Sequence, residues 1–481
     1  MNQQNNVRVL FLALLSSGIV LTACTRNEAP QPGAIALIGV RVINLNVGVA
    51  GEPSDILIRD GQIEGISATN SASIPSTYKE FEAEGMYVIP GLWDMHTHIR
   101  NDDELETFVP LLVAHGVVGV RDFWGFYPAE FDERLANVPH APHTYAAARQ
   151  MMGNNSATVG DARSRVRMLA ERGVDFIKVQ SDVPVDSFYA IVDEARSLGL
   201  DVAGHTPIGV SVSDASEAGL VSQEHLLEIV VETSEHAEAI RAQRVSSLTS
   251  GDLSMGEYIL ELGYPDLEPM LSTWSEEREQ MLFDTLIENH TWQTPSLVLF
   301  RAWSTMHLPE FWDNPSLKYV PVDWRDSWTP TSHKWYSHFP TDDPELVHAR
   351  IRATYESLLP ILQRMHEAGV PIMAGSDASQ WNFLVPGQSM HEELAIFVEA
   401  GMTPLEALRT ATAAPIDFLG QQGIAGAVAA GKRADLVILA KNPLEDIRNL
   451  SSVQAVLIRG SLFDREYLDD LLGELEQRSN P

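Results

Sequence analysis

The chain of 481 residues has a single cysteine, and it has only 33 Lys and Arg residues against 66 Asp and Glu. One cysteine excludes a disulfide framework and leaves no set of thiolates for a metal site. The shortage of basic residues gives a formal net charge of −33, which repels phosphate backbones, so we expect no nucleic-acid partner. The sequence also lacks internal repeats, low-complexity tracts and the glycine patterns of nucleotide-binding loops.

The chain does contain enough apolar sequence to build large cores, because 44% of its residues are hydrophobic and only 21% are charged. This composition is not that of a disordered acidic protein. The length predicts two or three domains at roughly 150 residues each, although one α/β barrel can occupy most of such a chain.

The N-terminus carries an apolar run that is too short to span a bilayer. Residues 9–21 follow the positive charge of Arg8, and a spanning helix takes about 20 apolar residues. The run therefore predicts a secretory signal peptide over residues 1–23. It ends in Leu-Thr-Ala before Cys24, which resembles the lipobox of bacterial lipoproteins, where the cysteine is lipidated.

This resemblance implies an exported protein held to a lipid bilayer through Cys24, on the periplasmic face or the cell surface. Residues 24–33 would then be a tether, polar and proline-containing. The alternative is an ordinary signal peptide followed by a chance cysteine. The only cysteine of the chain stands at the position that the lipobox requires, which favours the lipoprotein.

Short alternating strands with turn residues occupy both ends of the mature chain. Residues 55–59 and 62–66 flank an Asp-Gly turn, a hairpin signal, and residues 434–439 and 453–458 show the same pattern near the C-terminus. We therefore predict a small β-sandwich domain built from residues 34–86 and 421–465. Residues 466–481 are predicted to form a helical tail.

Between these ends, residues 87–420 alternate strand-like and helix-like stretches, which predicts βα units around a parallel sheet. Eight candidate strands begin near Tyr87, Val117, Thr144, Phe176, Asp201, Val221, Trp292 and Pro371. Helical spacing of apolar residues predicts helices over 161–172, 186–198, 212–218 and 345–368. Eight strands close a (β/α)8 TIM barrel, so the predicted fold class is α/β.

An insertion over about 233–345 makes this barrel longer than a plain one, and it is rich in tryptophan. Five of the ten tryptophans fall within 33 residues there: Trp303, Trp312, Trp324, Trp328 and Trp335. Two interpretations stay open. The aromatic side chains wall a substrate pocket, or they pack a lid on the barrel as ordinary core.

Polar side chains that suit metal binding follow several predicted barrel strands. His96 and His98 stand two apart directly after the first strand, so both imidazoles point the same way. Lys178, His205, His225 and Asp377 lie at the ends of later strands, where barrel active sites sit. Each has an ordinary alternative: a lysine that reaches solvent, a structural histidine, or a helix N-cap in the case of Asp377.

The motifs that carry these residues resemble the amidohydrolase superfamily, in particular its imidazolonepropionase-like and prolidase-like branch. They are PGLWDMHTH at 90–98, GVDFIKV at 173–179, VAGHTP at 202–207, SQEHL at 222–226, GVPIMAGSDA at 369–378, GMTPLEALRTAT at 401–412 and GKRADLVIL at 431–439. The resemblance covers nearly the whole mature chain. It is specific for the superfamily and not for a substrate.

The resemblance implies a site with two divalent metal ions, for which zinc is the expected metal. His96, His98 and Asp377 would bind the more buried ion, and His205 and His225 the other. Lys178 would be carboxylated and would bridge the two ions. An unmodified ammonium at Lys178 beside cations, flanked by Phe and Ile, would be costly to bury, which favours the carbamate.

The implied activity is hydrolysis of an amide in a small molecule, such as a dipeptide, an N-acyl amino acid or a cyclic amide. A metal-activated hydroxide would attack the carbonyl, and Asp377 would be the general acid/base. Two alternatives remain: a lactonase or phosphotriesterase on the same site, and a surface binding lipoprotein that has lost catalysis. The sequence leaves a homo-oligomer open.

A weaker prediction concerns the third strand, where relatives often present a substrate-binding group. His143, Tyr145 and Arg149 are the candidates there, although residues 141–152 match the family poorly. His391 and Glu392 begin like a zinc-binding HExxH helix, but residue 395 is Ala, so that interpretation fails.

Overall fold

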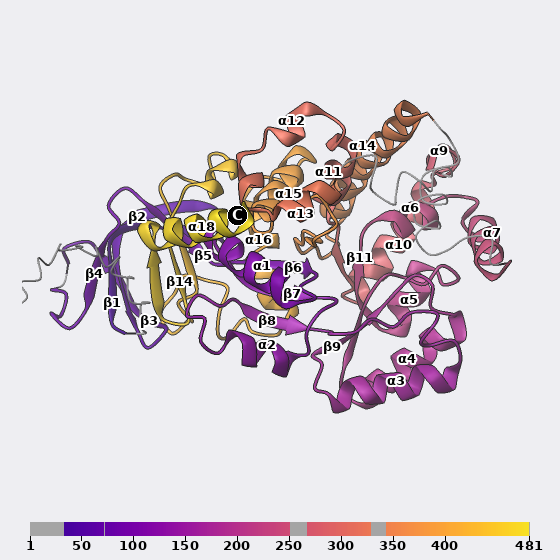
Figure 1. Cartoon of the computed structure of the whole chain (residues 1–481), viewed down its shortest axis with the longest axis horizontal. Coiled ribbons are helices and arrows are strands. Elements are labelled where there is room, and N and C mark those ends of the chain that lie inside the picture. The colour runs from indigo at the N-terminus through magenta and orange to yellow at the C-terminus, as the bar shows by residue number, and fades with distance from the viewer. Residues whose placement is uncertain (1–32, 72, 251–266, 329–342, 481) are drawn as a thin grey trace, which may run out of the picture.

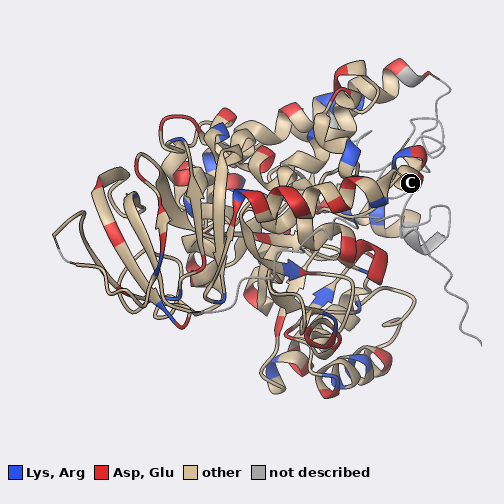
Figure 2. Cartoon of the chain, turned by 60° about the vertical axis from the view of Figure 1, so that its left-hand side comes forward, with Lys and Arg blue, Asp and Glu red and all other residues tan. Residues whose placement is uncertain are grey.

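The structure is a computed structural model that describes residues 33–71, 73–250, 267–328 and 343–480. The predicted signal peptide, Cys24 and nearly all of the predicted tether lie outside the described residues, and so does Trp335. Within the described ranges, no helix is long and apolar enough to cross a membrane. Acidic residues are spread over many of the helices and loops, as Figure 2 shows.

The two ends of the chain meet in one mixed sheet of eight strands (Figure 1). Its strands are β1 (Ile35–Asn44), β2 (Val49–Arg59), β3 (Gln62–Ala68), β4 (Lys79–Glu82), β5 (Tyr87–Pro90), β13 (Leu436–Leu439), β14 (Val453–Ile458) and β15 (Ser461–Asp464). The antiparallel pair of β5 and β13 joins the N-terminal strands to the C-terminal ones.

This sheet folds back on itself around one apolar core. Gln62 at the start of β3 forms an antiparallel bridge with Arg433, just before β13. Ile56, Val88 and Leu457 belong to the same buried cluster, although they come from both chain ends. The described strands thus make one hydrogen-bonded sheet in place of the two separate sheets of the predicted sandwich.

The middle of the chain has the α/β arrangement of TIM-barrel proteins. Its strands are β6 (Leu92–Thr97), β7 (Val117–Asp122), β8 (His143–Ala146), β9 (Phe176–Val179), β10 (Asp201–Gly204), β11 (Leu220–Glu224) and β12 (Trp292–Thr294). They form two parallel sheets, in the orders β6-β7-β8 and β12-β11-β10-β9. One parallel bridge, from Met151 to Val179, links the two sheets beyond the end of β8.

Two predicted strands differ from the structure. The predicted first barrel strand begins near Tyr87, but β5 pairs with β1 and β13 of the terminal sheet, so the barrel strands begin at Leu92. The predicted eighth strand, from Pro371, forms no continuous ladder. It makes isolated parallel bridges instead, from Ile372 to Gln293 and from Ala378 to Thr97.

Helices follow the strands as the periodicity predicts, and the four predicted helices are confirmed to within two residues as α3, α4, α5 and α14. The α-helices are α1 (Asp102–Ala114), α2 (Pro128–Leu135), α3 (Val159–Glu171), α4 (Val185–Ser197), α5 (Val212–Ala218), α6 (Leu227–Glu232), α7 (Ala237–Ser250), α9 (Leu267–Ser272), α10 (Glu276–Glu288), α11 (Leu297–Thr305), α12 (Pro309–Trp312), α13 (Val322–Ser327), α14 (Pro344–Ala368), α15 (Gln388–Glu399), α16 (Pro404–Thr410), α17 (Ala413–Phe418) and α18 (Arg465–Ser479). Two short 3-10 helices are η1 (Pro315–Tyr319) and η3 (Ile447–Ser451).

The end of α14 illustrates how local sequence positions the site. The helix ends at Gly369, whose φ of 87° is left-handed and favours glycine. The chain then turns directly into residues 371–378, which carry Asp377. Hydrogen bonds from Gln293 N to Pro371 O (2.9 Å) and from Met95 N to Ala374 O (3.1 Å) hold this segment between β12 and β6.

Candidate metal centre

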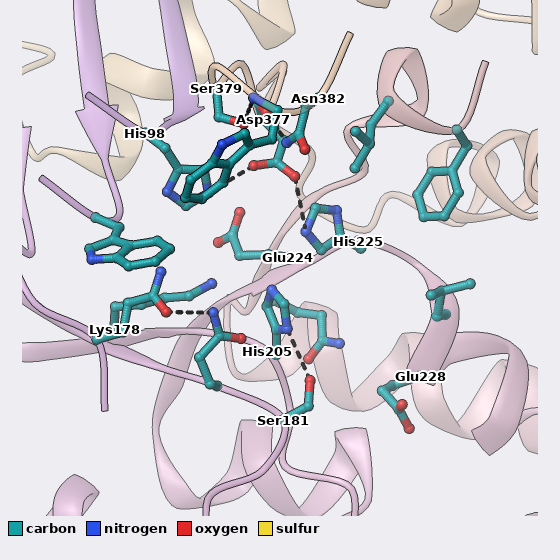
Figure 3. A pocket seen from close by; sticks show the side chains of 18 of the residues that line it. His98, Lys178, Ser181, His205, Glu224, His225, Glu228, Asp377, Ser379 and Asn382 are labelled. Carbon is teal, nitrogen blue, oxygen red and sulfur yellow. Dashed lines mark hydrogen bonds and ion pairs between the residues drawn. The ribbon is translucent and has the colours of Figure 1, made fainter. Parts of the chain in front are cut away.

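A cavity of about 330 Å³ opens at the carboxyl ends of the parallel strands in the middle of the chain (Figure 3). Five of the six residues predicted to bind metal line it: His98, Lys178, His205, His225 and Asp377. They come from segments that lie far apart in the sequence. The sixth, His96, is buried on β6 and contacts Asp377.

The imidazoles surround the carboxylate of Asp377. His98 Nε2 lies 2.8 Å from Asp377 Oδ1, and His96 Nε2 lies 3.6 Å from the same oxygen. His225 Nε2 lies 3.8 Å from Asp377 Oδ2. The His205 and His225 rings are 5.1 Å apart, so His205 joins the cluster from its far side.

The polar atoms of this cluster that lack a hydrogen-bond partner are suited to bind a divalent cation. Within the described residues, His96 Nε2, His225 Nδ1 and Lys178 Nζ are buried and have no hydrogen-bond partner. Leaving such a group unpaired costs about 1–3 kcal/mol. The ligand atoms of His96, His225 and Asp377 lie within 4.8 Å of one another, and imidazole nitrogen with carboxylate oxygen is a donor set that zinc accepts.

The backbone is strained where it presents two of these side chains. His225 has φ 62° and Asp377 has φ 58°, in the left-handed region that residues other than glycine seldom adopt. Such strain is kept where the surrounding structure fixes it, often at functional sites. Next to Asp377, a Cβ on Gly375 would lie 2.8 Å from His96 N, so only glycine allows this close approach to β6.

Burial sets the charge of the cluster. It lowers the pKa of His96 and of His205 well below the ordinary value, so both imidazoles are neutral at pH 7 and can act as ligands. Burial alone would raise the pKa of Asp377, but His96 and the hydrogen-bonded His98 lower it overall, so this carboxyl is ionised. Burial lowers the pKa of Lys178 to about 8.

The residues predicted for substrate binding on the third strand are not at this cavity. His143 Nε2 is 2.9 Å from Asp435 Oδ2, at the end of β8 that faces the terminal sheet. Tyr145 stacks on Phe176, and Arg149 is exposed. This prediction is corrected, because the residue that reaches the cavity is the next one, Gln150, which accepts a hydrogen bond from Gln180.

The tryptophan-rich insertion contributes to both of its predicted roles. Trp303 lines the cavity, whereas Trp328 is fully buried and packs as core. Three other aromatic side chains line the cavity and were not predicted from the sequence: Trp124, Phe300 and Trp381. The Trp124 and Trp381 rings lie 6.2 Å apart at the cavity, and no spacing pattern links residues 257 positions apart in the chain.

The fold is shared with solved hydrolase structures. A bottromycin amidohydrolase is 24% identical, with a TM-score of 0.66 over 94% of this chain and 91% of that one. The ochratoxinase of Aspergillus niger is 19% identical, with a TM-score of 0.61 over 90% of this chain and 96% of its own. A Xaa-Pro dipeptidase with bound methionine is 17% identical, with a TM-score of 0.61 over 90% of this chain and all of that one.

Sequence comparison finds relatives for segments of the chain. Residues 350–463, which include Asp377, match the model of the amidohydrolase family. A segment of 110 residues is 39% identical to the ochratoxinase of Aspergillus niger, and it covers 22% of this chain and 22% of that relative. Together with the fold, these matches support the relationship to the amidohydrolase superfamily that the motifs imply.

Proposed function

We propose that this protein is a metal-dependent hydrolase that cleaves an amide bond in a small molecule. The observation that carries the proposal is the cluster of imidazoles around one carboxylate, with one buried amine, at a cavity. The family match over residues 350–463 supports it, and so do the names of the relatives, which include an amidohydrolase and a dipeptidase.

We expect these side chains to hold two divalent ions, with zinc as the expected metal. His96, His98 and Asp377 would hold one ion, and His205 and His225 the other. When bound, such ions lower the pKa of water and polarise a carbonyl oxygen.

Lys178 would complete the site as a carbamate. Its amine is fully buried, and its pKa of about 8 leaves a fraction of the neutral amine at pH 7. Neutral amine adds to carbon dioxide, a C–N bond forms, and one proton leaves to solvent. The product is an anionic group with two oxygens, which replaces a buried cation by a ligand.

Asp377 would move the proton in the reaction. Its carboxylate is ionised and lies at the cavity, with Oδ1 against His98 and Oδ2 toward His225. The Asn382 side chain donates to Asp377 O at 2.7 Å, which holds the backbone of this residue in place. Oδ2 would accept a proton from the attacking water and then donate it to the leaving nitrogen.

The walls of the cavity favour a substrate with an apolar group beside its amide. Aromatic or aliphatic side chains line most of the wall away from the histidines: Trp124, Leu227, Leu299, Phe300, Trp303 and Trp381. Polar and charged side chains share the rest of the wall, among them Arg100, Gln150, Gln180, Glu228, Arg244 and Asn382. A dipeptide or N-acyl amino acid with an apolar side chain matches this division.

An activity screen with metal analysis tests the proposal. The purified protein should contain one to two zinc ions per chain and should hydrolyse a member of a panel of dipeptides and N-acyl amino acids. Asp377→Asn should lower kcat by several orders of magnitude while metal content stays near normal, because the amide cannot take the proton. Asp435→Asn, which changes a buried carboxylate paired with His143 outside the cavity, should keep its activity.

Other outcomes would contradict specific parts of the proposal. Turnover of lactones or phosphotriesters alone would move the substrate class away from amides. Absence of both metal and turnover would favour a binding protein. Full activity in Asp377→Asn would exclude Asp377 as the proton carrier.

We also propose that the protein acts outside the cytoplasm, anchored to a membrane through a lipid on Cys24. The support is the apolar run of residues 9–21 and the position of the only cysteine directly after it. Lipid chains on this cysteine would hold the enzyme at the bilayer surface without a spanning helix.

A further inference from the structure

A buried ion pair adjoins the candidate metal centre, and its Glu224 is one of the residues that line the cavity (Figure 3). Glu224 at the end of β11 and Arg121 on β7 are both fully buried as side chains, with Arg121 Nη2 2.9 Å from Glu224 Oε1. The Ser222 hydroxyl also donates to Oε1. The second oxygen, Oε2, lies 2.8 Å from His96 Nδ1.

Arg121 is held by groups on both parallel sheets. Its Nε donates to Met95 O at 2.7 Å on β6, and its Nη2 lies 3.1 Å from Thr294 Oγ1 on β12. Its guanidinium also lies over the Phe123 ring, 4.5 Å from the centroid. The position of the Glu224 carboxylate is therefore set by groups on several strands at once.

This arrangement decides which nitrogen of His96 carries the proton. A carboxylate that pairs with arginine offers only acceptors, so His96 Nδ1 must donate to Glu224 Oε2. The neutral imidazole then has its lone pair on Nε2, the atom that faces Asp377 and lacks a partner among the described residues. A ligating imidazole needs this lone pair.

His205, on the other side of the cluster, has a different partner. Its Nδ1 lies 2.9 Å from Ser181 Oγ, a neutral hydroxyl. An anionic acceptor makes the ligating imidazole more basic and strengthens its bond to a metal, whereas a hydroxyl does so far less. The two histidines thus differ in the charge of the group that contacts Nδ1: an anionic carboxylate at His96 and a neutral hydroxyl at His205.

We infer that Glu224, held by Arg121, is a positioning residue that fixes His96 as an Nε2 ligand and makes the His96 position the tighter of two metal positions. The inference rests on the proposed function, since it assumes that the cluster binds metal. It predicts sequential metal binding, with the His96 position filled first.

Zinc titration of the metal-free protein tests this inference. Competition with a chromophoric chelator should give two binding steps for the unmodified chain. Glu224→Gln should weaken the tighter step by about 10–100-fold, the usual effect of losing such a partner. Ser181→Ala should weaken the other step and leave the tighter one within twofold. Glu279→Gln is the matched control, because it neutralises a buried carboxylate paired with Arg364 that does not line the cavity.

A second measurement does not depend on metal. Two-bond ¹⁵N–¹H correlation spectra of histidine-labelled, metal-free protein report the tautomer of each ring, and a His96→Asn variant assigns the His96 signals. We expect the Nδ1–H tautomer in the unmodified chain and a shift toward Nε2–H in Glu224→Gln. If Glu224→Gln does not fold, Glu224→Asp withdraws the carboxylate by one methylene and should give the same trend.

Three results would overturn the inference. They are an Nε2–H tautomer at His96 in the unmodified chain, zinc affinity of Glu224→Gln within twofold of the original, or an equal loss of affinity in Glu279→Gln. Failure of the unmodified chain to bind zinc would refute the proposed function together with this inference. The three results above would refute only the role of Glu224.

Discussion

Trp328 connects the tryptophan-rich insertion to the candidate site, so its replacement gives a quantitative test. The side chain is fully buried, and its Nε1 donates to Gln380 O at 2.7 Å. Its ring packs against Phe383 with centroids 5.5 Å apart. Gln380 follows Asp377 by three residues, so Trp328 holds the loop that leaves the candidate proton carrier.

Trp328→Phe keeps an aromatic ring but removes the donor. The Gln380 carbonyl loses its partner in a partly buried position, which costs up to about 3 kcal/mol. The ring is smaller by roughly 40 Å³, and at about 24 cal/mol per Å³ of cavity this adds about 1 kcal/mol. We therefore expect the free energy of unfolding to fall by about 1–4 kcal/mol.

Urea denaturation followed by tryptophan fluorescence and circular dichroism measures this change. Trp381→Phe is the matched control, because Trp381 is 47% exposed and its replacement should cost less than about 1 kcal/mol. We also expect Trp328→Phe to lower kcat through the displaced loop. Equal stability of the two variants would refute the assigned role of Trp328.

Three further predictions follow from the site, the core and the N-terminus. A strong chelator should abolish hydrolysis and added zinc should restore it, whereas activity that survives with less than about 0.1 zinc per chain would contradict a metal centre. Burial raises the pKa of Glu393 from 4.5 to about 8, so the folded chain holds a proton between these values that the unfolded chain releases. Stability should therefore fall as pH rises through this window, by up to about 1.4 kcal/mol per pH unit, and Glu393→Gln should remove this contribution. Parallel pH profiles of unfolding free energy for the unmodified chain and Glu393→Gln would contradict this prediction. Cys24→Ser should release the protein from the membrane fraction, and unchanged membrane association would rule out the lipid anchor.

The elements and ligand candidates of the barrel could be predicted from local sequence. Apolar periodicity located α3, α4, α5 and α14, because a helix buries one face at a fixed spacing. Parallel strands present their carboxyl ends at one edge, so polar residues such as Lys178, His205 and His225 could be expected to converge. They do line one cavity together with Asp377.

Strand pairing was less predictable. Residues 87–90 are apolar enough for a barrel strand, but they pair with β1 and β13, and pairing partners depend on contacts far away in sequence. His143 similarly has the residue type of a ligand. The direction in which it points, toward Asp435, is a property of the packed domains and has no local signal.

The sequence alone determined which chemical groups are available: histidines, one lysine and one aspartate at strand ends, with the only cysteine directly after an apolar run. The tertiary structure determined which other residues contact these groups and line the cavity. Glu224 meets His96 across 128 positions of sequence, and Trp124 meets Trp381 across 257. Hydrogen bonds and ring contacts act over a few ångströms, so only the folded chain could bring these pairs together.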